Sequence, residues 1–431
     1  MKNFLFRFAS MLSIALLYSA CSLLIAQTSM PADVKPNVPL GTARGIFPGR
    51  VVWVHDPNVA SWDGKTGFWW SDTVTSQSEA NRMLTGALCS LAGEKKESKA
   101  WDKLFTYFNA QKKRGRHGFL KNEKIAVKIN TNNTDRHGNT NEINASPQSV
   151  LALIRSLVEE AKVPQKNLTI FDASRYMTDN IFDKCHRAYP DVIFVDHVGG
   201  EGRTKAEFKD NAIPYSADNG KLAQGLALCA IDADYLIDLA VLKGHVGQGV
   251  TLCAKNFYGV TSIDPDWRKN FHNNFDQDRS GKPRYMTFVD FLGHKDLGEK
   301  TMLFLIDGFY GAREVNGLPS RKWKMPPFND HWAASIFASQ DGVAIDCVGL
   351  DFLRSEWPDA PDMPYSDAYL IEAALANDPP SKTVYDPERD GTRLPSLGVM
   401  EHWNNMNDKK YSRNLGKKEG IELFPVSYSK K

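Results

Sequence analysis

Several short motifs that often reveal an activity are missing from the 431 residues of this chain. The six cysteines form no CxxC pair, so the sequence predicts neither a zinc ribbon nor an iron–sulfur cluster. There is no GxSxG motif and no cysteine in a nucleophile context, which argues against covalent catalysis by serine or cysteine. No HExxH or HxH spacing occurs, so any metal ligands would have to come from separate strands.

A strong charge of either sign is also missing. The chain has 53 basic and 51 acidic residues, which gives a formal net charge of +2. A balance this even gives no electrostatic reason to expect nucleic acid or a membrane surface as a partner. The basic run KKRGRH at residues 112–117 is short, and we interpret it as a solvated loop.

The glycine-rich stretch GHVGQG at residues 244–249 matches no nucleotide-binding motif. It lacks the lysine and hydroxyl residue of a Walker A loop, and Leu252 stands where GxGxxG needs its third glycine. Two interpretations stay open. Residues 250–259 form a short helix whose N-terminus faces an anion, with Lys243 and Lys255 adding charge, or they form a surface loop with solvated lysines.

The first residues are typical of a targeting segment. Lys2 and Arg7 precede an apolar stretch from Met11 to Ala26, which predicts a signal peptide over residues 1–26 and a protein exported to the periplasm or beyond. Residues 27–50 contain four prolines and are interpreted as a linker. One alternative is an uncleaved membrane anchor. Another is lipid attachment at Cys21, although the apolar residues after it fit that poorly.

Short apolar runs of strand length dominate the rest of the chain. Several are continuously apolar rather than alternating, which favours strands covered on both faces, as in a parallel sheet. They lie at residues 51–56, 124–130, 168–174, 192–197, 235–245 and 302–308. Between the second and third, Ser146 and Pro147 begin a predicted helix that ends at Pro164. This strand–helix–strand unit indicates an α/β fold.

We therefore predict an α/β fold with a mostly parallel sheet and helices on both faces. The α/β domain is placed at residues 51–355. An irregular, aromatic-rich C-terminal segment at residues 356–431 is expected to pack on the same domain. Within residues 335–353, Asp341 is expected to cap a helix that follows a strand.

Each predicted strand ends in polar or charged side chains. Since ligands of open α/β sheets bind beyond the carboxyl ends of the strands, these side chains predict a shared site. The alternative is that strands end in polar residues because loops are solvated. The residues concerned are His55, Asp56, Lys128, Asn130, Asp172, Ser174, Asp196, His197, Lys243, His245 and Asp307.

Three of the candidate site residues carry predicted catalytic roles. His245 is the predicted acid–base group, because its reference pKa lies near working pH, and Lys255 and Asp307 are expected to assist it. Substrate-binding roles are predicted for Lys128, Asn130, Asp172, Lys243, Asn256 and His402. The two asparagines would orient hydroxyls or an oxyanion. A divalent metal of unspecified identity, held by His55, His197 or His245 with nearby aspartates, is a further interpretation.

Two polar stretches outside the strands also suggest ligand contacts. Residues 131–146, with His137, are rich in asparagine and suit sugar hydroxyls or phosphate, or else form a solvated connection. The group EHWNN at residues 401–405, which contains His402, resembles a sugar-binding surface, or else belongs to a packed tail.

Several motifs together resemble one known family, the domain of unknown function 362 family. They are VKIN (127–130), LKGH (242–245), KNFYG (255–259), IDGFYG (306–311) and SQDGVAID (339–346). The resemblance extends over about residues 50–355, and the tail at 397–423 is similar to that of exported members. It implies one α/β domain. The family-type positions that it implies are Lys128, Asn130, Lys243, His245, Lys255, Asn256, Asp307 and Asp346. Some relatives carry a ferredoxin-like cluster motif that this chain lacks, and the family has no agreed activity to carry over.

Two functions remain open from the sequence. The first is an exported enzyme acting on a small polar or anionic substrate, with a saccharide as one candidate. The second is a non-catalytic envelope protein that binds an anion or sugar. In both, the partner is a small molecule, nucleic acid is not expected, and only the N-terminal segment would touch a membrane.

Overall fold

A computed structural model of the chain describes residues 34–262 and 283–429. The predicted signal peptide at residues 1–26 lies outside the described residues, as does the first part of the predicted linker. Within the described ranges, no helix combines the length and apolarity needed to cross a bilayer.

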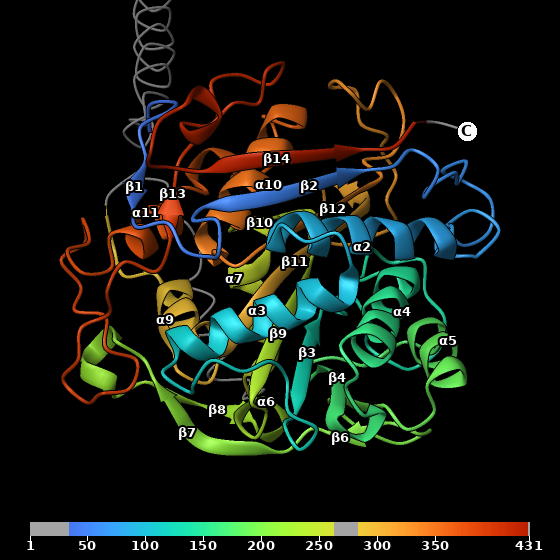
Figure 1. The fold of residues 1–431 in the computed structure, drawn as a ribbon, viewed down its shortest axis with the longest axis horizontal. Coiled ribbons are helices and arrows are strands. Elements are labelled where there is room, and N and C mark those ends of the chain that lie inside the picture. The colour runs from blue at the N-terminus through green and yellow to red at the C-terminus, as the bar shows by residue number, and fades with distance from the viewer. Residues whose placement is uncertain (1–33, 263–282, 430–431) are drawn as a thin grey trace, which may run out of the picture.

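A ten-stranded sheet runs through the molecule (Figure 1). Along its main path the strands follow the order β14, β2, β12, β11, β9, β3, β4, β5, β6, and β10 pairs with β9. Most neighbours are parallel, whereas β12 and β10 run antiparallel to their partners. The strands span Glu422–Ser427, Arg50–His55, Ser335–Ser339, Thr301–Ala312, Tyr235–His245, Ile125–Ile129, Leu168–Asp172, Ile193–Asp196, Thr204–Lys205 and, for β10, Gly249–Thr251.

All six predicted strands are present in this sheet, which confirms the α/β interpretation. Strand β9 spans Tyr235–His245, the same bounds as the predicted strand, and β11 is buried along its whole length. Continuous burial on both faces explains why these runs are apolar without alternation. Strand direction is not visible in such a run, so the antiparallel insertion of β12 was not predicted.

Helices cover both faces of the sheet, as predicted, and divide the core into two halves. The first half packs on α2 (Gln77–Ala92), α3 (Glu97–Gln111), α4 (Pro147–Arg155) and α5 (Asp179–Ala188). The second half packs on α7 (Cys253–Asn256), α9 (Thr287–Gly293), α10 (Gly342–Glu356) and α11 (Ala368–Ala374). Figure 1 shows α2 and α3 in front of the sheet and α10 behind it.

The start of α4 follows the sequence signals closely. Ser146 accepts a hydrogen bond from the Ser149 amide, and Pro147 occupies the first helical turn. After Arg155 the backbone continues as a π-helical turn, Ser156–Glu160, so the predicted helix changes its hydrogen-bonding pattern before Pro164. The unit formed by β3, α4 and β4 is parallel, as predicted.

The chain order within the sheet creates a switch point between β3 and β9. From β3 the chain moves outward through β4, β5 and β6, then returns to pair β9 on the other side of β3. Strands β3, β4, β5, β9 and β11 are parallel, so their carboxyl ends meet at one edge. Open α/β sheets bind ligands at such a point.

The C-terminal segment packs onto the same core and contributes to the sheets. Strand β14 extends the main sheet beside β2, and β13 (Val399–Met400) pairs with β1 (Leu40–Gly41). Trp403 and Tyr411 are buried. Asp341 caps α10 by accepting from the Val343 and Ala344 amides, as expected. A second small sheet joins β7 (Phe208–Pro214) to β8 (Ala223–Ala227), and α6 (Leu228–Ile231) follows it.

Candidate functional site

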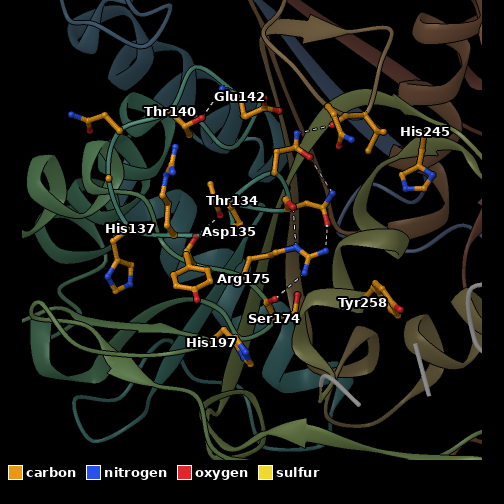
Figure 2. A pocket seen from close by; sticks show the side chains of 18 of the residues that line it. Thr134, Asp135, His137, Thr140, Glu142, Ser174, Arg175, His197, His245 and Tyr258 are labelled. Atoms are coloured by element: carbon orange, nitrogen blue, oxygen red, sulfur yellow. Dashed lines mark hydrogen bonds between the residues drawn. The ribbon is translucent and has the colours of Figure 1, made fainter. Parts of the chain in front are cut away.

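A polar cavity of about 880 Å³ opens at the carboxyl edge of the sheet, beside the switch point. Figure 2 shows Arg175 between His137 and His245, with His197 below. Segments far apart in the sequence build its wall: residues 132–140 with Glu142, residues 174–176, His197, His245, Lys255, Tyr258, Val315 and Asn316.

A much smaller chamber of about 20 Å³ adjoins this cavity. The two share Asn132, Ser174, Lys255 and Tyr258 in their walls. The chamber is further lined by Lys128, Asn130, Asp172, Thr251, Asn256 and Gly259. Five predicted site residues therefore meet here, namely Lys128, Asn130, Asp172, Lys255 and Asn256, and the outer cavity adds His245.

A buried ion pair forms the wall of the chamber. Lys128 Nζ lies 3.1 Å from Asp172 Oδ2, and the two residues are only 1% and 2% exposed. Lys128 also donates to Asn256 Oδ1 at 3.0 Å and to the Ile129 carbonyl, so all three ammonium protons have acceptors. Asp172 is satisfied in turn by Lys128, Thr131 and Ser174. Full pairing is what makes two buried charges tolerable.

Asn256 connects this ion pair to the centre of the sheet. Its Nδ2 donates to Asp238 Oδ1 at 2.5 Å, and its Oδ1 accepts from Lys128. Burial raises the pKa of Asp238 well above its usual range, although the bond from Asn256 and the charge of Lys128 oppose this. Asn256 therefore works as a structural bridge between β9 and β3.

The segment that follows the glycine stretch does form a short helix, α7, but its N-terminus is occupied from within. The amides of Cys253 and Ala254 donate to the two oxygens of Asp346 at 2.8 and 3.0 Å. A protein carboxylate thus takes the place of the expected ligand anion. This contact gives Asp346 a supporting role and places Lys255 on the wall of both cavities.

The glycine stretch itself is a hairpin rather than a phosphate-binding loop. Strand β10 folds back on β9, with Gly249 opposite His245. Gly247 and Gly249 adopt positive φ angles of 89° and 76°. A Cβ atom on Gly249 would lie 1.7 Å from Ser366 Oγ, so the turn requires glycine for space as well as conformation. The hairpin fixes His245 at the cavity wall.

Arg175 is a wall residue that the sequence analysis missed. Its guanidinium donates to the carbonyl and side-chain oxygens of Asn132 at 2.9 and 3.4 Å and to the Ser174 carbonyl at 3.3 Å. Arg175 lies three residues after Asp172, which ends β4. This position just beyond a strand end is the sequence signal that could have identified it. The asparagine-rich stretch considered above lines the same wall.

The histidines differ in their surroundings. His137 Nε2 lies 2.7 Å from Asp196 Oδ2, and its Nδ1 lies 3.2 Å from Glu201. His197 and His245 line the outer cavity, whereas His55 packs edge-on against Phe328. Among the described residues, no three histidine, cysteine, aspartate or glutamate side chains are grouped in a way that would hold a metal ion.

Lys243 lines neither the outer cavity nor the chamber. It is fully buried, and its Nζ donates to the Ile143 carbonyl at 2.9 Å. Burial, together with the nearby charge of Lys255, lowers the pKa of Lys243 to about 7. Its predicted contact with substrate stays a prediction, since it lines neither cavity.

Asp307 faces the opposite side of the sheet and holds the start of α4. Its Oδ2 accepts from the Ser146 amide at 2.8 Å, from Ser146 Oγ at 2.7 Å and from Ser149 Oγ at 2.6 Å, and its Oδ1 accepts from the Phe309 amide. Asp307 lines neither cavity. The structure thus does not bring it together with His245 and Lys255, and its predicted catalytic role stays a prediction.

His402 also lies outside the two cavities. It is buried between Asp351, 2.6 Å from its Nδ1, and Asp367, 3.1 Å from its Nε2. Burial by itself lowers the pKa of this imidazole, but the two carboxylates raise it to about 10. Its contacts match the packed-tail alternative. His402 lines neither cavity, so its predicted role in substrate binding stays a prediction.

No curated protein matches this sequence. A family model does match: the domain of unknown function (DUF362) covers residues 125–351, which is more than half of the chain. The matched range includes the chamber and both ends of the hairpin that carries His245. The chain therefore belongs to the domain of unknown function 362 family.

Proposed function

We propose that this protein is an exported enzyme that binds a small anionic substrate in the cavity at the carboxyl edge of the sheet. Phosphorylated sugars and sugar acids are the first classes to consider, because the wall combines cations with many amide groups. The proposal rests mainly on one observation, the convergence of Arg175, Lys255 and His245 on one cavity from three separate elements.

The distribution of charge within the wall supports an anion. Cationic side chains outnumber carboxylates in the wall, with Arg136, Arg175 and Lys255 against Asp135 and Glu142. Of the two acidic residues in the wall, Glu142 accepts from the Gly317 amide at 2.6 Å, and Asp135 is exposed. A bound anion would therefore be attracted to the part of the wall formed by Arg175 and Lys255.

His245 supplies the group for proton transfer. It ends β9 at the cavity wall, and the hairpin with β10 fixes its backbone. Imidazole exchanges protons near neutral pH, so His245 would take a proton from the bound substrate or return one to it. Lys255 lies in the same wall and would stabilise negative charge that develops during the transfer.

A binding screen followed by two variants tests the proposal. Inorganic phosphate, sugar phosphates and sugar acids are screened by thermal shift, and Kd is measured for each stabilising compound. We expect Lys255→Met to weaken binding by roughly 10- to 100-fold, the loss typical of a hydrogen bond to a charged group. Lys382→Met, at an exposed lysine paired with Asp378, is the control and should leave Kd unchanged.

The catalytic part is tested separately with His245→Gln. Turnover of any stabilising compound should fall by about 10²- to 10⁴-fold, the usual contribution of general acid–base catalysis, while Kd changes little. Undiminished turnover would remove His245 from the mechanism. If none of the screened anions stabilises the protein, the whole proposal is wrong.

The alternative, a non-catalytic binding protein, is favoured by the neutral amides of the wall. Asn132, Asn133, Asn139 and Asn316 line the cavity, and amides bind hydroxyls without exchanging protons. A stabilising ligand that is recovered chemically unchanged after long incubation would support this alternative. Export is tested independently by fractionating cells that express the full chain, with a Lys2→Glu/Arg7→Glu variant expected to remain inside.

A further inference from the structure

The amide of Asn130 has an orientation that its neighbours fix. Lysine carries only hydrogen-bond donors, so the atom of Asn256 that faces Lys128 Nζ at 3.0 Å must be its oxygen. Asn130 lies 3.3 Å from that same oxygen and must therefore turn its NH₂ group toward it. The Oδ1 atom is then the polar atom of the Asn130 amide that does not face Asn256.

This oxygen is a buried acceptor without a donor. Asn130 is 4% exposed, and among the residues that the structure describes none donates a hydrogen bond to its Oδ1. Leaving such an atom unpaired costs free energy, which a ligand or ordered water can recover. Asn130 also lines the small chamber, so this acceptor belongs to the site proposed above.

The size of the chamber limits what can meet Asn130. Its volume of about 20 Å³ is close to the space that a single water molecule needs. One hydroxyl group fits. An anionic oxygen, in contrast, would face the oxygen of Asn130 as acceptor against acceptor. The anionic group of a ligand therefore stays in the outer cavity, beside Arg175 and Lys255.

We propose that Asn130 is a specificity-determining residue whose Oδ1 accepts a hydrogen bond from a substrate hydroxyl in the chamber. This rests on the proposed function and narrows its substrate class to hydroxylated anions, such as hydroxy acids or sugar phosphates. In such a ligand the anionic group binds in the outer cavity and a nearby hydroxyl enters the chamber. An anion of the same size without that hydroxyl leaves Asn130 unpaired.

Matched pairs of probes test this inference. The pairs are glycerol 3-phosphate with propyl phosphate, lactate with propionate, and ribose 5-phosphate with 2-deoxyribose 5-phosphate. For at least one pair, the wild-type protein should bind the hydroxylated member about 10-fold more tightly, as expected when a buried acceptor gains its donor.

The variant Asn130→Ala should remove most of this preference while it changes the affinity for the deoxy member by no more than about 3-fold. Asn130→Ser, which keeps a small polar side chain, serves if the alanine variant does not fold. Asn377→Ala is the matched control, because Asn377 is an exposed asparagine that lines neither cavity, and it should keep the preference.

The outcomes separate the two proposals. If both members of every pair bind equally well and still depend on Lys255, the role of Asn130 is wrong and the anion site stands. If Asn130→Ala retains the preference for hydroxyls, the role of Asn130 is again wrong. If no probe binds at all, both proposals fail.

Discussion

Gly259 illustrates at the scale of a residue how tightly the chamber is built. A Cβ atom at this position would lie 2.6 Å from Lys128 Nζ and 2.7 Å from Asp172 Oδ1. The φ angle of Gly259 is not positive, so space rather than backbone conformation requires glycine here.

We predict that Gly259→Ala displaces the buried ion pair and lowers the free energy of unfolding by about 1–3 kcal/mol, the range seen for overpacked cores. Urea unfolding measures this loss. Gly225→Ala is the control, since its nearest neighbour, Ser262 Oγ, lies 3.1 Å away and can adjust. An effect at Gly259 no larger than at Gly225 would contradict the packing described here.

Replacing Lys128 should lower the free energy of unfolding more than replacing an exposed lysine does. In Lys128→Met the Asp172 carboxylate stays buried without its counter-charge, and losses of about 3–5 kcal/mol are typical in that case. Urea unfolding of Lys128→Met and of the exposed control Lys382→Met gives the comparison. Equal stability of the two variants would show that the ion pair is not needed for folding.

The residues of the chamber were predictable because strand ends in a parallel sheet converge. Lys128, Asn130 and Asp172 were identified in this way, and their meeting follows from the β3–β4 pairing. Which side of the sheet a side chain faces was harder to predict. Asp307 ends an equally apolar run, yet it faces α4, because one residue along a strand changes the face.

Among the elements, the junction between β11 and α4 depends on Asp307. Its carboxylate receives hydrogen bonds from Ser146 and Ser149, the first residues around the helix start. We predict that Asp307→Ala leaves these buried donors unpaired and lowers the free energy of unfolding by about 1–3 kcal/mol. Ligand affinity of the folded variant should change by less than about 3-fold, because Asp307 lines neither cavity.

Calorimetric titration and urea unfolding of Asp307→Ala measure both quantities. A normal free energy of unfolding combined with a large loss of turnover would instead support the catalytic role predicted from the sequence. The variant thus shows whether Asp307 supports the start of the helix or acts on the substrate.

Element boundaries were easier to predict than element pairing. The six apolar runs, the Ser146 cap and the Asp341 cap all carry local signals, and all are present. The antiparallel course of β12 and the fold-back of β10 depend on contacts with distant segments. For the same reason, the carboxylate that caps α7 comes from Asp346, ninety-odd positions away in the chain, and was not predicted.

At the scale of the whole molecule, His402 attaches the tail at residues 397–423 to α10 and α11. It contacts Asp351 of α10 and Asp367, which precedes α11. Because the two carboxylates raise its pKa from 6.5 to about 10 in spite of burial, the stabilisation is fully present below pH 6.5 and is lost as the pH rises through about 10.

We therefore predict that His402→Gln lowers the free energy of unfolding by about 1–3 kcal/mol at pH 6, because it removes the cation between Asp351 and Asp367 while Asp367 keeps its ion pair with Arg354. The difference from wild type should shrink at pH 10.5. Urea unfolding at the two pH values measures it, and His331→Gln, at an exposed histidine, is the control. A difference that stays constant with pH would mean that His402 is not held as a cation.

The central claim is that strands far apart in the sequence form one anion-binding cavity at a shared edge of the sheet. A crystal structure of the protein with the most strongly stabilising anion tests this most directly. We predict that the anionic group lies within hydrogen-bonding distance of Lys255 and Arg175 in the cavity between His137 and His245. An anion bound at high occupancy elsewhere, with this cavity filled only by solvent, would contradict the account.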